Sequence, residues 1–531
     1  MKARVQLIRE ISKSRTLSLV PLVVLLAAPS LYLFLRFPPL WRDSDGFYQV
    51  YAAFSEFTIL HWPPLYCFFA RIPIALGQII NALFCGQGFP GFQILPPIFT
   101  DLGIYLLIFL QHVLLIGTLF FICISLTRSP LVRSLIAGLF ALSPPLYAFA
   151  HSVGSESLSN ILTLLCAVLG YKCLCARAPS RVLVFWFVAV LVATILTRHV
   201  NTILVGLLPA TYILILGFKL LFNPLNRMNE TAIFEQFYLR LFLKFLFLAG
   251  LSVVIAHLVV LGVCRYWKTP YRSRVGYTFE WRLFYLGSLS RASQEQILEK
   301  VDKNLHDPAV SFALQKGQEL LKTTNSWDAS VLHLALYEWL ADHGVIGWKR
   351  LHLEGDRRLN RIALQFLLYG GSDFWGLVMH EFWTSLNYSP ADICGEAFRT
   401  TDLFVQMSAG PAFVPVRHLS TLRPRHESYE SEWSRDPYLT VGQGVPMWAM
   451  MLALLGGAAW SLFFRRLQVP EISLYAVSLA VTGIVISIAN CALTILLARF
   501  TLSLYILLLF GLAMVLASLS EPRALPPGAP R

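Results

Sequence analysis

Two aspartates stand close together shortly after the first long apolar run of the chain. Asp43 and Asp45 flank Ser44 in the segment FPPLWRDSDGFYQVY, which begins at Phe37. A carboxylate beside a nucleophile can accept its proton, and it can also hold a divalent cation that takes up the charge of a leaving phosphate. Ser44 or Asp45 can instead cap the helix that we expect to follow. The sequence leaves these three roles open.

Further chemically capable residues occur later in the same segment. Tyr48 follows the aspartates, and His61 opens the run HWPPLY. An imidazole can act as a second base or as a metal ligand. A histidine beside Trp-Pro-Pro can also be purely structural, because the two prolines stop a helix and fix a bend. Both readings of His61 remain open.

Isolated charges stand at the expected outer ends of later apolar runs: Glu156, Arg198 and Arg499. A bare ion near hydrocarbon is unfavourable unless it is paired or faces water. A guanidinium stays charged and can bind two phosphate oxygens at once, which makes Arg198 and Arg499 candidates for holding a phosphate. They can instead reach lipid headgroups. Glu156 can hold a substrate or pair with either arginine.

A basic run leaves another apolar segment on the expected outer side. It has the sequence CRYWKTPYRSR and includes Arg265, Arg272 and Arg274. These cations can bind the phosphate of a lipid-linked substrate. Attraction to anionic lipid headgroups explains such a run equally well.

Composition identifies the class of protein that must position these residues. Of the 531 residues 56% are hydrophobic and 14% are charged, whereas soluble domains have about 25% charged residues. Repeated apolar runs of about 20 residues indicate an all-α polytopic membrane protein. The net charge of +13 comes mostly from basic residues that flank these runs, which indicates orientation and contact with headgroups and not nucleic-acid binding. The nine scattered cysteines form no CxxC pair, so we expect neither a disulfide framework nor a metal cage.

The apolar runs predict about ten membrane-spanning helices with both chain ends on the cytoplasmic side. The predicted spans are 17–35, 101–126, 135–150, 158–175, 182–197, 202–221, 246–263, 447–464, 472–497 and 502–519. In the first outer loop we expect an interfacial helix after Asp45 and a second one over 65–83 that is broken at Pro73. A separate interfacial helix is predicted over 223–244.

Four regions follow from this pattern. Residues 1–264 form an N-terminal transmembrane module that includes the outer loop 37–100, and residues 446–519 form the C-terminal spans. Between them, 265–445 predict a mainly helical extracytoplasmic domain with amphipathic helices at 290–301, 329–340 and 359–369. Its tryptophans, among them Trp375 and Trp383, are compatible with stacking on sugar rings or with a place at a membrane interface. The proline-rich tail 520–531 predicts disorder.

Taken in order, these motifs resemble a known family, the membrane-embedded GT-C glycosyltransferases, and especially the bacterial branch related to protein mannosyltransferases and aminoarabinose transferases. The resemblance rests on Asp43 or Asp45, Tyr48, the run 61–66, Ser155-Glu156, Thr197-Arg198 and Arg499-Phe500. Two departures are visible. The family's Asp-Glu pair is Asp-Ser-Asp in this chain, and its Arg-Tyr at the last span is Arg-Phe. The likeness covers about 1–265 and 445–519.

The resemblance implies a bundle of GT-C type and an inverting sugar transfer at the extracytoplasmic face of the inner membrane of the cell envelope. The donor would be a polyprenyl-phosphate sugar and the acceptor a lipid, glycan or protein. Asp43 or Asp45 would activate the acceptor, and Arg198, Arg499 or the run from Arg265 would hold the phosphate, with a divalent cation left open. The rival class is a transporter or lipid flippase, which should place ionisable residues in the middle of its helices.

Overall fold

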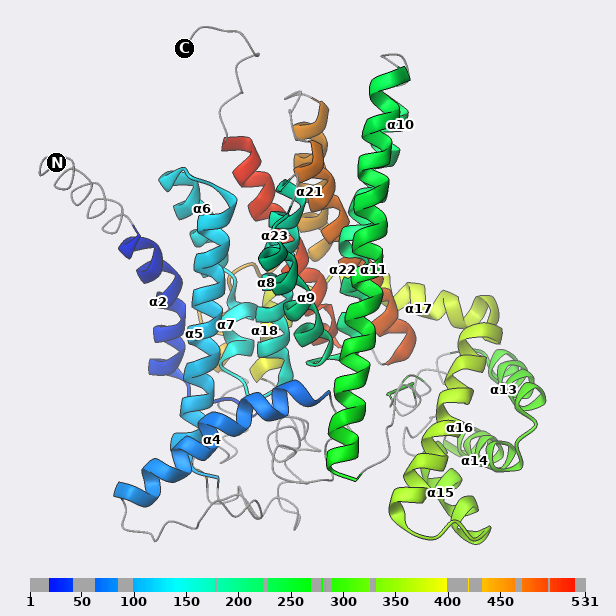
Figure 1. Cartoon of the computed structure of the whole chain (residues 1–531). Helices are drawn as coiled ribbons and strands as arrows, with labels where there is room; N and C mark the ends of the chain where they lie inside the picture. The colour runs from blue at the N-terminus through cyan, green and yellow to red at the C-terminus, as the bar shows by residue number, and fades with distance from the viewer. Residues whose placement is uncertain are drawn as a thin grey trace, which may run out of the picture.

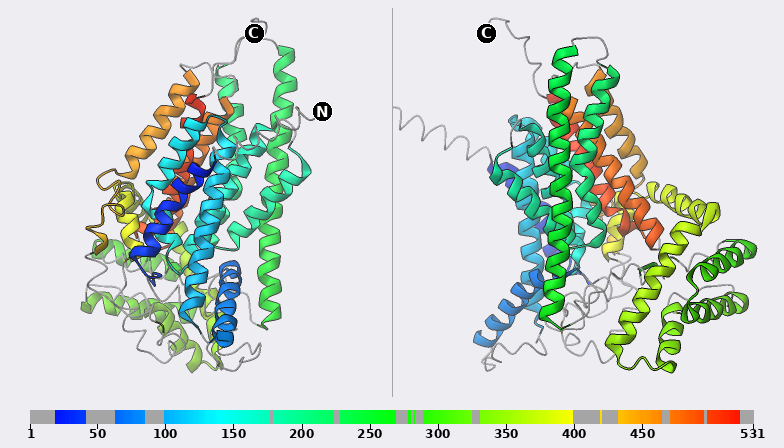
Figure 2. Two further views of the ribbon diagram at one scale, coloured as in Figure 1. Left: turned by 90° about the vertical axis from the view of Figure 1, so that its left-hand side faces the viewer. Right: turned by 45° about the vertical axis from the view of Figure 1, so that its right-hand side comes forward.

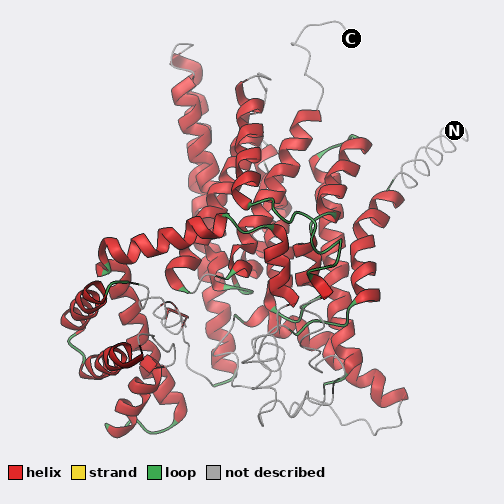
Figure 3. Ribbon diagram, turned by 180° about the vertical axis from the view of Figure 1, so that it is seen from behind, coloured by secondary structure: helices red, strands yellow, loops and turns green. Residues whose placement is uncertain are grey.

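The computed structural model describes residues 19–41, 63–84, 99–176, 179–222, 228–268, 278–279, 282, 289–324, 331–398, 419, 432–463, 470–494 and 497–520. Within this part of the chain the regular elements are helices, and an isolated β-bridge joins Leu40 to Ser152. Figure 3 shows that helices make up the described architecture throughout. The expected all-α class is therefore confirmed for the described residues.

A bundle of long helices forms the body of the molecule (Figure 1). Its elements are α2 (Val20–Arg36), α4 (Pro64–Phe84), α5 (Asp101–Leu126), α6 (Pro130–Ala141), α7 (Pro144–Ala150), α8 (Ser155–Cys175), α9 (Arg181–Ile195), η1 (His199–Gly206), α10 (Leu207–Phe222), α11 (Met228–Tyr266), α21 (Met447–Phe463), α22 (Pro470–Leu493), η5 (Ala498–Thr501) and α23 (Leu502–Ser520).

A smaller group of helices lies beside one end of the bundle. It consists of α13 (Arg291–Leu305), α14 (Pro308–Thr324), α15 (Val331–Asp342) and α16 (Trp348–Tyr369). From it α17 (Gly371–Leu386) leads to the bundle, where α18 (Pro390–Phe398) packs on α7. Figures 1 and 2 show α13 to α16 at the end of the bundle opposite to the start of α2 and the end of α23. This arrangement agrees with the expected topology. The side of the membrane on which each end lies stays a prediction.

Seven described helices are long and apolar enough to cross a membrane, or up to nine if each of two bent pairs is counted as one span. The chain is therefore a multi-pass membrane protein. The expected number of about ten is not reached by this criterion, because α2, α9 and α21 are apolar but have only 17, 15 and 17 residues. At about 1.5 Å per residue these three span about 22–26 Å, less than a hydrocarbon core of about 30 Å.

The centre of the bundle is formed by α8 and α23. Protein buries 72% of the most apolar 18-residue window of α8 and 78% of that of α23. The corresponding share for α11 is 17%. A helix at the centre faces protein on all sides, so it can carry polar side chains that lipid would exclude. This explains why α8, and not a peripheral helix, carries the buried Glu156.

Helix α4 corrects one prediction. The expected break at Pro73 is absent, and α4 continues through it over 21 residues. Proline removes a backbone hydrogen bond and clashes with the preceding turn. Here Pro73 is buried together with Ala70, Ile74 and Gly77 on the same helix. Packing of this face against the bundle offsets the local penalty, and neighbouring helices commonly accommodate proline in this way.

Helix α11 corrects a second prediction. The expected interfacial helix 223–244 and span 246–263 are one continuous helix of 39 residues. The first glycine after Met228 is Gly250, and no proline lies between them, so nothing in the local sequence ends the helix. A helix of this length measures about 58 Å and extends beyond a hydrocarbon core of about 30 Å.

The expected span 135–150 is bent. Helices α6 and α7 meet at an angle of 61° across Leu142 and Ser143, and α7 begins with Pro144-Pro145. A proline excludes the helical conformation from the residue before it and lacks a backbone donor. The broken span therefore follows from the two prolines.

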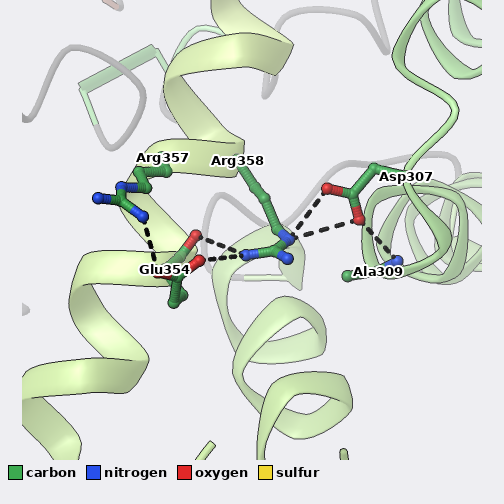
Figure 4. A network of polar contacts seen from close by, with 5 residues as sticks. All are labelled: Asp307, Ala309, Glu354, Arg357 and Arg358. Atoms are coloured by element: carbon green, nitrogen blue, oxygen red, sulfur yellow. Dashed lines mark hydrogen bonds and ion pairs between the residues drawn. The ribbon is translucent and has the colours of Figure 1, made fainter.

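A polar network joins two helices of the smaller group (Figure 4). Arg358 of α16 pairs with Asp307 at 3.1 Å and with Glu354 at 3.0 Å, and Arg357 binds the other oxygen of Glu354 at 3.0 Å. Asp307 also accepts a hydrogen bond from the backbone N–H of Ala309 at 3.0 Å, in the first turn of α14. The network thus connects the start of α14 to the middle of α16.

Candidate functional site

An ion pair lies at the end of the bundle nearest to α13 to α16. Arg198 Nη1 is 3.4 Å from Glu156 Oε1, and the two side chains are 25% and 8% exposed. Glu156 lies in the first turn of α8, where the helix dipole favours a negative charge. Arg198 has an extended backbone and immediately precedes η1. Two of the predicted site residues are therefore brought together, with the guanidinium the more accessible partner.

The carboxylate of Glu156 lies over the backbone of Gly154. A Cβ atom added to Gly154 would stand 2.8 Å from Glu156 Oε2, closer than any ordinary contact. Glycine leaves the space that this carboxylate occupies. The local sequence thus helps to fix the position of the acidic group.

Tyr66 connects the first turn of α4 to the turn before Glu156. Its hydroxyl accepts a hydrogen bond from the Gly154 N–H at 2.8 Å and donates to Gln111 Oε1 at 3.1 Å. One residue earlier, the N–H of Leu65 donates to the carbonyl of Leu196 at 3.0 Å. The start of α4 is therefore bound both to the turn before Glu156 and to the turn before Arg198.

The described start of the loop that follows α2 reaches the same turn. The N–H of Leu40 donates to the carbonyl of His151 at 3.0 Å, and the N–H of Val153 donates to the carbonyl of Leu40 at 2.9 Å. His151 Nε2 lies 3.0 Å from the carbonyl oxygen of Phe37. The chain that leads to the predicted aspartates is thus paired with the residues just before Glu156.

Four predicted site residues of that loop lie outside the described residues: Asp43, Asp45, Tyr48 and His61. Of the described residues, Trp41 precedes Asp43 and Pro63 follows His61, and both are buried. The roles assigned to the four residues therefore stay predictions.

Asn201 fixes the turn that carries Arg198. Its side-chain amide donates to Ser159 Oγ at 2.8 Å and to the carbonyl of Thr194 at 3.0 Å. These bonds join η1 to α8 and to the end of α9. Because Asn201 is 1% exposed, breaking them would leave buried polar groups without partners, which is unfavourable.

Arg499 lies in η5, between α22 and α23. Its guanidinium carbon is 4.9 Å from the ring centroid of Phe500, a cation–π contact. The carbonyl of Phe500 accepts a hydrogen bond from Asn490 of α22 at 2.9 Å. η5 also contacts α18, which in turn packs on α7. That Arg499 shares one cavity with Glu156 and Arg198 stays a prediction.

Arg265 is exposed in the last turn of α11. Ala256 of the same helix packs with Leu196, next to the turn of Arg198. Arg265 follows Ala256 by nine residues, which corresponds to about 13 Å along a helix. It therefore lies farther along α11 than the level of the Glu156–Arg198 pair. Arg272 and Arg274 lie outside the described residues.

A buried chain of polar side chains was not among the predicted site residues. His112 Nδ1 is 2.8 Å from Ser30 Oγ, and His112 Nε2 is 3.2 Å from His151 Nδ1. Because His151 Nε2 faces the carbonyl of Phe37, it must donate. The neutral pair then has one consistent pattern, in which Ser30 donates to His112 and His112 donates to His151. The sequence signal for it was Gln111-His112 inside an otherwise apolar run.

A metal site is not assembled by the described residues. Among them, no group of three or more His, Cys, Asp or Glu side chains is placed to hold a metal ion. Comparison of the chain with protein-family models and with curated proteins gives no match.

Proposed function

We propose that this protein is a membrane glycosyltransferase of GT-C type. It moves a sugar from a polyprenyl-phosphate donor to a lipid, glycan or protein acceptor at the membrane face where α13 to α16 lie. One observation carries the proposal. The start of the loop that contains Asp43, the start of α4 and the turn of Arg198 all converge on the first turn of α8. Charged and polar groups thus gather at one end of the bundle, which supports a site for a lipid-linked substrate there.

The transfer needs a proton acceptor and a group that stabilises the leaving phosphate. In the proposed reaction the acceptor hydroxyl or amine gives its proton to the carboxylate of Asp43 or Asp45 and attacks the anomeric carbon of the donor. The bond from that carbon to the phosphate oxygen breaks, and its electron pair stays on the oxygen. Attack from the face opposite to the phosphate inverts the configuration at the anomeric carbon.

Arg198 is placed to bind the phosphate. A guanidinium offers paired donors to phosphate oxygens and stays charged. Glu156 Oε1 lies 3.4 Å from Arg198 Nη1, and this ion pair orients the guanidinium. Arg499 and the basic run from Arg265 are further phosphate candidates.

Substitution of the two aspartates tests the proposal. Asn caps a helix about as well as Asp, so Asp43→Asn and Asp45→Asn should insert and fold normally. Loss of a general base should lower the transfer rate by roughly 10²- to 10⁴-fold in at least one of them. The assay is sugar transfer from a polyprenyl-linked donor by the purified variants. If both variants keep near-normal rates, the paired-carboxylate mechanism is wrong.

A transporter or flippase is the second candidate, and a specific observation favours it. His112 and His151 are buried inside the bundle, and His151 directly follows the bent pair α6 and α7. Buried ionisable groups beside a broken helix are typical of ion-coupled transport. The two functions are separated by assay in detergent, because sugar transfer needs no sealed compartment and transport does.

A further inference from the structure

Helix α17 joins the smaller helix group to the bundle and changes the direction of the chain. The pair α16 and α17 is apolar enough for a span, but it is bent by 96° at Gly370. Figures 1 and 2 show α17 running across the long direction of the bundle helices. Its 16 residues measure about 24 Å. The bend excludes a single straight span through both helices.

One face of α17 is packed against protein. Phe374, Val378 and Phe382 are spaced one helical turn apart and are buried, and α17 contacts α22 and α21. On the same side Glu381 pairs with the buried Arg282 at 2.5 Å. This face therefore fixes how α17 is rotated about its axis.

Next to this buried face, about 100° around the helix, lies a stripe of large apolar side chains, which we call the α17 stripe: Trp375, Met379 and Trp383. They follow one another at intervals of four residues and so share one side of the helix. Trp375 is 40% exposed and Trp383 is 60% exposed, and Met379 is half-buried. Tryptophan is enriched where hydrocarbon meets water, because its ring is apolar and its N–H needs a polar partner.

The end of α17 lies beside the start of the apolar helix α21, which the sequence predicts to enter the membrane. The backbone N–H of Met447 donates to the carbonyl of Tyr388 at 3.0 Å. Tyr388 lies two residues after α17 ends, and Met447 is the first residue of the apolar helix α21. The next residue, Trp448, is 44% exposed. The end of α17 is thus held beside the first turn of the apolar helix α21.

We propose that the α17 stripe inserts into the headgroup–acyl boundary of the bilayer and anchors the helices α13 to α16 to the membrane surface. An in-plane amphipathic helix with tryptophans on its apolar face binds lipid in this way. The bilayer is the expected partner, because the end of α17 lies beside the start of the apolar helix α21. The inference depends on the membrane class of the protein and not on the proposed sugar transfer.

Photo-crosslinking tests the anchor directly. Benzoylphenylalanine is introduced at Trp375, at Trp383 and, as a control, at Ile346, and each protein is reconstituted in vesicles of equal parts phosphatidylethanolamine and phosphatidylglycerol. Ile346 is 82% exposed but lies in the loop before α16, and the 22 residues of that helix separate it from α17 by about 33 Å. Irradiation should yield severalfold more phospholipid adduct at positions 375 and 383 than at 346, measured by mass spectrometry.

Two outcomes would overturn the anchor. Phospholipid adducts at positions 375 and 383 that are as scarce as at position 346 would show that the α17 stripe faces water. Adducts between two copies of the chain at 375 and 383, without lipid adducts, would show that the stripe is a protein interface. Neither result bears on sugar transfer, which is assayed separately.

Discussion

The backbone N–H of Gly154 donates a hydrogen bond to the hydroxyl oxygen of Tyr66 at 2.8 Å, and this bond joins α4 to the start of α8. The hydroxyl proton is directed to Gln111 Oε1 at 3.1 Å, so Tyr66 uses its oxygen as donor and acceptor at once. Tyr66 is 1% exposed. The turn before Glu156 therefore depends on a buried contact with a residue that lies 88 positions earlier in the chain.

Replacing Tyr66 with Phe should loosen this turn. Gly154 loses its acceptor and Gln111 loses a donor, and an unsatisfied buried polar group costs about 1–3 kcal/mol. We expect the free energy of unfolding in detergent to fall by that amount and the transfer rate to fall with it. Tyr266→Phe is the matched control, because Tyr266 is 77% exposed and should change neither quantity. A Tyr66→Phe protein as stable as the parent would contradict the role of this bond.

A double-mutant cycle at Glu156 and Arg198 should separate the effect of the ion pair on stability from its effect on the transfer rate. Removing one partner leaves a largely buried charge, and breaking such a pair costs about 3 kcal/mol. Glu156→Gln and Arg198→Gln should each reduce stability, and the double variant should recover part of it because no lone charge remains. Transfer should stay low in Arg198→Gln and in the double variant, because the phosphate ligand is missing. Recovery of activity in the double variant would show that the pair is purely structural.

The contact between α4 and α5 should not tolerate a methyl group at Gly77. A Cβ added there would lie 2.4 Å from the Cα and N atoms of Gly103, so the two helices would have to move apart. Overpacking of this kind costs about 1–3 kcal/mol, and we expect Gly77→Ala to lower the melting temperature and the transfer rate. Gly117→Ala on α5 is the control. No atom lies within 4 Å of its added Cβ, and alanine is the better helix former by about 1 kcal/mol. Equal effects of the two substitutions would refute the close contact.

His112→Gln should distinguish the enzyme from the transporter. Glutamine offers an oxygen toward Ser30 and an N–H toward His151, which reproduces the neutral hydrogen-bond pattern. If the chain is an enzyme, sugar transfer in detergent should stay within severalfold of the parent rate, because His112 has no part in the reaction. A variant that keeps its fold but loses proton-driven flux across vesicles would support the transporter instead.

Local sequence was sufficient to predict the bundle helices, since each long apolar run has to satisfy its backbone hydrogen bonds within itself when it lies in lipid. The predicted span 101–126 has the same bounds as α5. The prediction was wrong for α11, because it ended one helix at Lys244 and began another at Leu246. No proline or glycine stands there to end the helix. The two prolines that follow the bend between α6 and α7 were also visible in the sequence.

The candidate site was predictable in part. Sequence reasoning selected Glu156 and Arg198 because isolated charges at the ends of apolar helices need partners, but it left open whether Glu156 pairs with Arg198 or Arg499. The structure pairs it with Arg198. It also adds Tyr66, Gln111 and His151 to the candidate site, because these residues make contacts between separate helices.

The sequence alone thus determined the membrane class, the helical segments and the charges that require pairing, because hydropathy and helix geometry act over a few turns of one segment. The tertiary structure decided which charge meets which, that α4 passes through Pro73, and that α17 turns across the bundle. Those outcomes depend on packing between helices far apart in the chain, where a contact such as that of Gly77 with Gly103 outweighs a local preference.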